Sequence, residues 1–215
     1  MGRGGYALLG AAVIWSLGRR ALSVERAAPS RAAAVQLWTQ LSVLNNDPYL
    51  QVADTALGLI SVFDDLRYDR ADLDMLSPPM RNRARAKLQP LGFRQVSGTV
   101  FEARDANVRV IMPKSHALGA SPFDITLYTP KRETDLYLLT PTQTACQFVD
   151  GYPRDEAVAR IKTLIEKHPI NLDRLGDYLE KKPQHAAFLP AIGHLKFHQR
   201  EAVAKEPLCR RRALG

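Results

Sequence analysis

Apolar residues follow a helical spacing in the first part of the chain. Residues 31–44 combine helix-forming composition with apolar positions near one face, and the turn-forming sequence from Asn45 to Pro48 ends this segment. The next stretch, residues 49–66, repeats a spacing of three and four at Leu50, Ala53, Leu57, Ile60 and Phe63. The pattern therefore predicts two successive helices, the second of them buried.

A break in this pattern leads into the middle of the chain. Residues 71–76 have the composition of a short helix and are followed by a Ser-Pro-Pro sequence. Ser77 is a suitable N-cap and a proline fits the first turn, so we expect a basic helix over about residues 79–88. After Gly92 the apolar period becomes two, which predicts a hairpin of strands 93–97 and 99–103.

Further strands and then helices account for the rest of the chain. The segments NVRVIMP, PFDITLYT and DLYLLTP are rich in residues that favour strands, and helical patterns return over residues 141–150, 154–168, 171–181 and 184–199. This order predicts an α+β fold, with N-terminal helices that include a winged-helix-like segment, a central and mostly antiparallel sheet, and a helical C-terminal part. We divide the chain into an apolar and basic N-terminal segment (1–30), a helical, winged-helix-like region (31–104), a strand-rich and then helical region (105–200) and a basic tail (201–215).

The charge balance of the chain favours acidic partners. The 215 residues include 30 Lys and Arg against 22 Asp and Glu, which gives a formal net charge of +8. Such a surface suits nucleic acid, an anionic membrane or an acidic protein, although a basic surface that serves only solubility is the alternative.

The region of residues 71–104 is the strongest candidate for nucleic-acid binding. A short helix, a tight turn, a second helix and a hairpin are the parts of a winged helix-turn-helix, whose second helix enters the major groove of DNA. The basic residues expected to contact DNA are Arg81, Arg83, Arg85 and Lys87 on the helix and Arg94 on the wing. The alternative is a solvated amphipathic helix that packs through Met80, Ala84 and Leu88.

Together with this segment, the strand-to-helix sequence LTPTQTACQFVD (139–150) resembles bacterial abortive-infection antitoxins of the AbiE type, over about residues 70–180. The family's element typically reads Ser/Thr-Pro-x-Arg-Thr, followed by apolar residues and an aspartate. Thr140, Pro141 and Thr144 match, whereas Gln143 replaces the arginine and the acid falls late, at Asp150. The resemblance implies a DNA-binding winged helix that represses its own promoter, and a C-terminal domain that opposes a nucleotidyltransferase-like toxin.

Acidic residues suggest an alternative enzyme function. Asp72 and Asp74, with Asp124 on a predicted strand, have the chemistry of a Mg²⁺ site for nucleotidyl transfer, and Glu102, Asp124 and Lys114 suggest a nuclease-like site. The simpler interpretation is a solvated face with local ion pairs over residues 64–74.

Histidines near the C-terminus form the other candidate metal site. His194 and His198 lie one helical turn apart with Cys209 beyond them, but this pair has no defined third ligand. We therefore expect no metal and no cofactor, and the basic residues of the tail, Arg210, Arg211 and Arg212, are read as a surface that contacts nucleic acid or lipid or as a disordered end.

The N-terminus leaves two locations open. Residues 6–18 form an apolar run that is too short to span a bilayer but long enough for a signal-peptide core or an interfacial anchor. A helix that packs on the body of the protein is the favoured interpretation. With only two cysteines, a disulfide framework is not expected, so we predict a cytoplasmic protein, with association with the inner membrane as the alternative.

Overall fold

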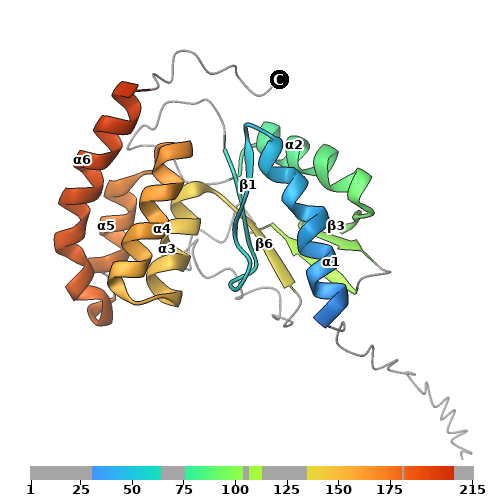
Figure 1. The fold of residues 1–215 in the computed structure, drawn as a ribbon, viewed down its shortest axis with the longest axis horizontal. Helices are drawn as coiled ribbons and strands as arrows, with labels where there is room; N and C mark the ends of the chain where they lie inside the picture. The colour runs from blue at the N-terminus through green and yellow to red at the C-terminus, as the bar shows by residue number, and fades with distance from the viewer. Residues whose placement is uncertain (1–30, 64–75, 104–106, 113–134, 181, 206–215) are drawn as a thin grey trace, which may run out of the picture.

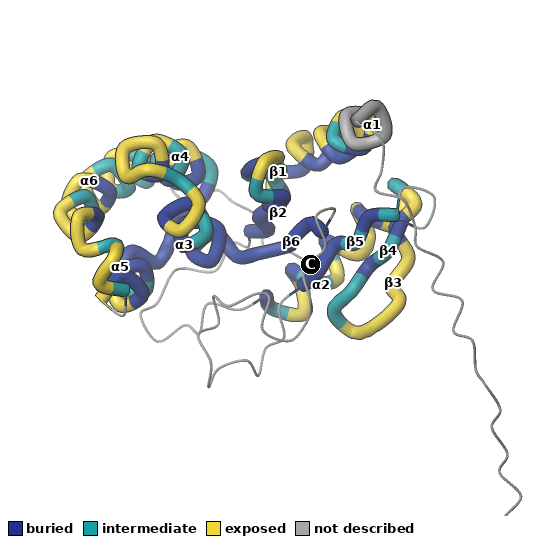
Figure 2. Tube along the Cα trace, turned by 90° about the horizontal axis from the view of Figure 1, so that it is seen from below, coloured by how far each residue is buried: buried dark blue, intermediate teal, exposed yellow. Residues whose placement is uncertain are grey.

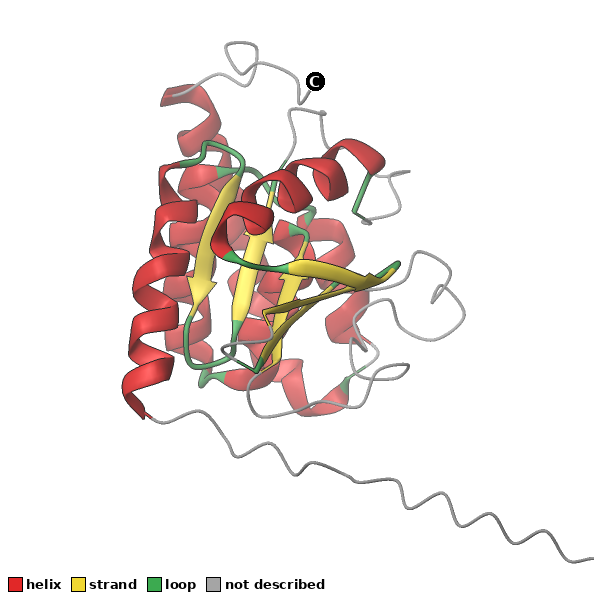
Figure 3. Ribbon diagram, turned by 90° about the vertical axis from the view of Figure 1, so that its right-hand side faces the viewer, coloured by secondary structure: helices red, strands yellow, loops and turns green. Residues whose placement is uncertain are grey.

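The fold is a β-sheet with helices on both faces (Figure 1). The computed structural model describes residues 31–63, 76–103, 107–112, 135–180 and 182–205. One helical layer contains α1 (Arg31–Leu41), the short 3₁₀ helix η1 (Ser42–Asn46) and α2 (Pro78–Leu88). The other contains α3 (Pro141–Gly151), α4 (Arg154–Lys167), α5 (Leu172–Glu180) and α6 (Leu189–Lys205). Figure 3 shows the strands between these helices, and the arrangement confirms the predicted α+β class.

The sheet has six strands in the order β1-β2-β6-β5-β4-β3. Their bounds are Leu50–Asp54 for β1, Leu59–Val62 for β2, Arg94–Ser97 for β3, Val100–Ala103 for β4, Val108–Ile111 for β5 and Asp135–Leu139 for β6. Strand β6 is parallel to both of its neighbours, whereas the other neighbouring pairs are antiparallel. The sheet is therefore mixed, and it joins strands from residues 31–104 with strands from residues 105–200.

Each face of the sheet builds one hydrophobic core. The side chains of Leu59, Tyr137 and Leu139 pack with the helices α3 to α6. On the opposite face, apolar residues of every strand except β3 pack with α1, η1 and α2, among them Ile60, Val110 and Leu138. This strict alternation follows from the period of two in a strand, and it places α2 and α3 on opposite sides of the sheet.

The predicted buried helix over residues 49–66 is wrong, because the described part of this segment is the hairpin β1–β2. Its turn is fixed by Asp54, whose Oδ1 accepts a hydrogen bond from the N–H of Leu57 at 2.7 Å. Gly58 follows with a φ of +69°, and a Cβ there would lie 2.9 Å from the carbonyl oxygen of Asp135. Only glycine therefore fits this position, where the hairpin approaches β6.

The basic helix and the hairpin of the winged-helix-like segment form as expected, but within the larger sheet. The helix is α2, and strands 93–97 and 99–103 correspond to β3 and β4. Strand β4 also pairs with β5, so the hairpin continues the six-stranded sheet and is not a separate wing. The other predicted helix of this segment falls on residues 71–76, of which 71–75 lie outside the described ranges, as does the predicted strand PFDITLYT.

The C-terminal helical layer follows the sequence closely. Helix α3 begins with a capping box in which Thr140 Oγ1 accepts from the N–H of Gln143 at 3.2 Å and Gln143 Oε1 accepts from the N–H of Thr140 at 3.1 Å. The predicted last helix divides into a 3₁₀ segment, η4 (Pro183–Phe188), and α6. None of the helices in the described ranges has the length and apolar character needed to cross a membrane. Residues 6–18 lie outside those ranges.

Candidate nucleic-acid interface on helix α2

Helix α2 begins and ends at clear local signals. The Oγ of Ser77 accepts a hydrogen bond from the N–H of Met80 at 3.4 Å, and two prolines occupy the first turn. Proline is tolerated there because the first N–H groups of a helix have no partner within the helix. The segment closes at Gly92, which has a φ of +85°, and Phe93 then returns its N–H to the carbonyl of Leu88 at 3.3 Å.

One face of α2 is fixed against the sheet. Met80, Ala84 and Leu88 are at most 4% exposed and pack in the same core as Phe101 and Val110. These are the positions that the alternative interpretation of an amphipathic helix selects. Their burial sets the rotation of the helix, so the direction of every other α2 side chain follows from it.

The basic residues of α2 lie in two rows that flank its outermost face. Because successive residues of a helix are about 100° apart, Arg81 and Arg85 follow one side of the buried stripe, and Arg83 and Lys87 follow the other. The outermost positions belong to exposed residues without charge, Asn82, Ala86 and Gln89. The helix itself contains no acidic residue.

The row of Arg83 and Lys87 is held by a buried carboxylate. Asp47, whose side chain is 3% exposed, accepts hydrogen bonds at Oδ2 from Arg83 Nε at 3.2 Å and Nη2 at 2.7 Å, and Lys87 Nζ lies 3.0 Å from the same oxygen. Its Oδ1 accepts from the N–H of Tyr49 at 3.0 Å. The two cations remain 34% and 43% exposed, so they meet Asp47 on one side and water on the other.

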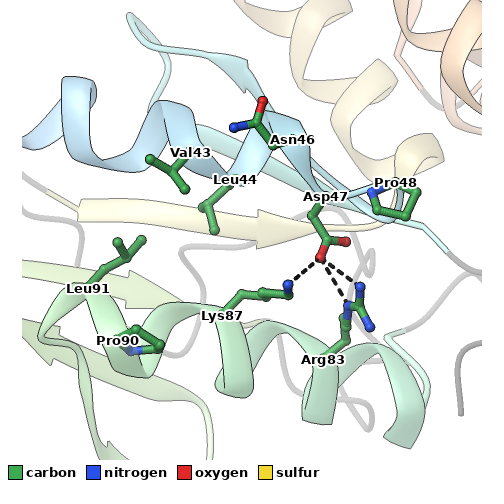
Figure 4. A pocket seen from close by; sticks show the side chains of 9 residues that line it. All are labelled: Val43, Leu44, Asn46, Asp47, Pro48, Arg83, Lys87, Pro90 and Leu91. Atoms are coloured by element: carbon green, nitrogen blue, oxygen red, sulfur yellow. Dashed lines mark hydrogen bonds and ion pairs between the residues drawn. The ribbon is translucent and has the colours of Figure 1, made fainter.

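These charges lie at the wall of a cavity of about 330 Å³ between η1 and the end of α2 (Figure 4). Most of its lining is apolar, from Val43, Leu44, Pro48, Pro90 and Leu91. The close-up shows Arg83 and Lys87 converging on Asp47 from successive turns of α2. Sequence reasoning missed Asp47, which was read only as part of a turn that ends a helix.

In the other row, Arg81 reaches back to the residues before the helix. Arg81 Nε donates to the carbonyl oxygen of Leu76 at 2.9 Å, and partial burial lowers the pKa of Arg81. Arg85 is exposed. It therefore offers an accessible positive charge on this side of α2.

The structure places Arg94 away from the other four predicted residues. In the strand register Arg94 lies opposite Glu102, Glu102 opposite Arg109, and Arg109 opposite Asp135. Directly opposed residues share a face of the sheet, and the face of Asp135 is that of Tyr137, opposite to α2. Arg94 and α2 therefore cannot form one continuous wing-and-helix surface.

The predicted metal and enzyme residues gain no support in the described ranges. There, no group of three or more His, Cys, Asp or Glu side chains is arranged to hold a metal ion. His198 Nε2 lies 3.6 Å from a carboxylate oxygen of Glu166, and His194 is exposed. The remaining candidates fall outside the described residues: Asp72, Asp74, Lys114, Asp124, Cys209 and Arg210 to Arg212.

Two further carboxylates join elements of the fold. Asp54 Oδ2 accepts from Tyr152 Oη at 2.7 Å and from Arg160 Nη1 at 2.5 Å, which ties the β1–β2 turn to α3 and α4. Asp150, the late acid of the LTPTQTACQFVD element, contacts Tyr178, Lys182 and His185. Asp54 and Asp150 therefore act as structural links between elements.

Comparison of the chain with family models, curated proteins and solved structures gave no match.

Proposed function

We propose that this protein is a DNA-binding regulator that inserts the exposed side of α2 into the major groove. The observation that carries the proposal is the pattern around the helix: an uncharged outermost face flanked on both sides by basic side chains. The composition agrees with it, since the chain has a net charge of +8.

This pattern matches the shape of the major groove. The groove is about 12 Å wide and admits one helix, so phosphates lie on both flanks of the helix while base edges face its outermost residues. Arg81 and Arg85 would reach one phosphate backbone, and Arg83 and Lys87 the other. The short side chain of Ala86 lets the helix approach the bases closely.

Two amides on the outermost face supply the groups that read sequence. Asn and Gln side chains donate and accept at once, and both form paired hydrogen bonds with adenine in the major groove. Asn82 on α2 and Gln89 at its C-cap are exposed and lie about two turns apart. Their substitution by alanine should relax the preference for particular sites while leaving non-specific affinity nearly unchanged.

Asp47 adjusts the charge that α2 presents. It offsets one unit of the positive charge on Arg83 and Lys87, and it also restricts the directions of both side chains. Long basic side chains lose entropy when they bind, so side chains that are already oriented lose less. We assign Arg94 no part in this interface, because it lies on the other face of the sheet.

The experiment is a salt titration of the full-length protein with a fluorescent duplex of mixed sequence. Arg85→Ala and Lys87→Ala should each lower the slope of log K against log salt by about 0.9, the value for one lost phosphate contact. Arg200→Ala is the matched control, since Arg200 is also exposed but lies on α6 in the other helical layer. Equal slopes for Arg85→Ala, Arg200→Ala and the unchanged protein would contradict the proposal.

An antitoxin role, with a toxin as protein partner, is the specific form of this proposal that the AbiE-type resemblance suggests. In the structure, Thr140 and Gln143 cap α3 and Asp150 links it to α5, so their contacts are structural. Co-purification with a nucleotidyltransferase-like protein encoded beside this one, and relief of its toxicity, would support the role. We also propose a cytoplasmic location, in keeping with DNA as the partner.

A further inference from the structure

Among the strands that the structure describes, β3 is an edge of the sheet. It follows β4 at the end of the strand order, and all of its residues, Arg94 to Ser97, are exposed. Figure 2 shows it in yellow beyond β4, whereas the central strand β6 is buried along its length. An edge strand presents backbone N–H and C=O groups that no neighbour uses, and an extended segment of another chain can pair with them.

A row of alternating charges crosses the sheet and ends at this edge. From β6 outward, directly opposed positions hold Asp135, Arg109, Glu102 and Arg94. Asp135 and Arg109 form a two-pronged ion pair, with Nε–Oδ1 at 2.8 Å and Nη2–Oδ2 at 2.6 Å. Opposite charges at directly opposed positions stabilise strand pairing, and like charges destabilise it.

Each inner member of the row has an opposite charge on both sides, but Arg94 does not. Arg109 lies between two acids, and Glu102 lies between two arginines. Arg94 faces Glu102 on one side only, because β3 is the last strand in the order of the described strands. A strand added beside β3 would place its own residue opposite Arg94.

We propose that β3 binds an extended acidic peptide segment as an added strand, with one Asp or Glu of the segment opposite Arg94. The backbone of the segment pairs with the open side of β3, and its carboxylate continues the alternation of charge. Val96, which is 49% exposed, offers the added strand an apolar contact.

The charge of β3 disfavours pairing with the same strand of a second copy of the chain. The β3 sequence, Arg-Gln-Val-Ser, contains no acid, so self-pairing would leave both Arg94 side chains without an opposite charge. The strand is also short and has a register shift between Gln95 and Ser97. Such irregularities limit indiscriminate edge pairing, so they favour a short partner segment whose charge matches.

The test uses the full-length protein and a blocked peptide, acetyl-Thr-Val-Thr-Glu-Thr-Val-Thr-amide, followed by NMR titration and amide hydrogen exchange. We expect protection at Arg94 to Ser97, and affinity about fivefold higher than for the analogue with a central Lys. Arg94→Glu should reverse this preference, and Arg94→Gln should remove it. An analogue that is N-methylated at alternate residues keeps the charge but cannot pair as a strand, so it should not bind.

Three outcomes would overturn the proposal. They are equal affinity for the Glu and Lys peptides, retained binding of the N-methylated peptide, and protection that appears at β3 with protein concentration alone. The last would identify a second copy of the chain as the occupant. Because Arg94 is exposed and lies outside α2, none of these results depends on DNA binding.

Discussion

Replacement of Asp47 by asparagine should weaken the fold while it strengthens DNA binding. The carboxylate is 3% exposed and accepts from Arg83 and Lys87 at Oδ2, and from the N–H of Tyr49 at Oδ1. Asparagine keeps one oxygen acceptor but replaces the other with an NH₂ donor. In either orientation, therefore, a donor faces a donor in place of an accepted hydrogen bond.

The size of the expected stability loss follows from how exposed Arg83 and Lys87 are. Hydrogen bonds to charged groups contribute about 1.5–3 kcal/mol each, and removal of one partner from a fully buried ion pair costs about 3–5 kcal/mol. Arg83 and Lys87 are 34% and 43% exposed, so both regain water when the carboxylate is lost. The expected loss is therefore about 2 kcal/mol, below the range for fully buried pairs.

Urea unfolding measures this loss directly. With m near 3 kcal/mol/M, the midpoint should fall by about 0.7 M at unchanged m. Asp173→Asn is the matched control, because Asp173 pairs with Lys196 at 3.1 Å but is 44% exposed, and its loss should cost less than about 0.5 kcal/mol. In the same Asp47→Asn protein, the salt slope for DNA should steepen by up to about 0.9, since one more positive charge is free on α2. Equal destabilisation by Asp47→Asn and Asp173→Asn would refute the reasoning, and so would a stability loss accompanied by weaker DNA binding.

Three further changes test the fold on the opposite side of the sheet. Thr140→Ala removes one half of the capping box with Gln143 and should cost about 1 kcal/mol in thermal unfolding, whereas Thr140→Ser should retain most of the stability. Burial raises the pKa of the Asp150 carboxyl, but hydrogen bonds from Lys182, Tyr178 and His185 outweigh burial and lower the pKa overall. Asp150 therefore stabilises the fold above its unfolded pKa of about 3.9, and this contribution is lost as the pH falls through that value and the lower folded pKa. Asp150→Asn should accordingly flatten the loss of stability in acid, and an unchanged acid profile would contradict this assignment. Ser61 is fully buried on β2, and its Oγ has no hydrogen-bond partner within the described ranges, so Ser61→Ala should stabilise by about 1 kcal/mol; a lower melting temperature would show that the hydroxyl is satisfied.

The sequence predicts elements well where local chemistry determines them. Ser77 and Thr140 each start a helix, and both structural N-caps lie at these residues. Strands β3 and β4 follow from their period of two, and β5 and β6 follow from their content of residues that favour strands. These signals involve residues that are close in sequence, so they can be recognised without reference to the rest of the chain.

The hairpin β1–β2 shows why the same reasoning fails elsewhere. Its apolar residues come from two strands and the turn between them, and they fall by coincidence at a spacing of three and four. Strand β2 is buried on both faces because β6 and two helical layers surround it, and a strand of this kind has no alternation. Without the later strand β6, nothing in the segment distinguishes a buried strand from a buried helix.

The candidate site was predictable in its residues but not in its geometry. The spacing of Arg81, Arg83, Arg85 and Lys87 is evident in the sequence, and so is the apolar stripe between them. The role of Asp47 is not, because it depends on how η1 packs beside α2. Arg94 falls on the opposite face of the sheet because its strand register with Glu102, Arg109 and Asp135 sets its direction.

The position of β6 has a consequence for how the protein folds during synthesis. The hairpin β1–β2 and the meander β3–β4–β5 pair strands that are close in sequence, so each can form soon after it is made. Among the described strands, only β6 joins these two units, and it follows both in the chain. Until the ribosome has released β6, β2 and β5 expose edges that are buried in the finished molecule. We therefore expect nascent chains that end before Asp135 to depend on chaperones and to aggregate, and chains that extend past Leu139 to be the first to close the sheet.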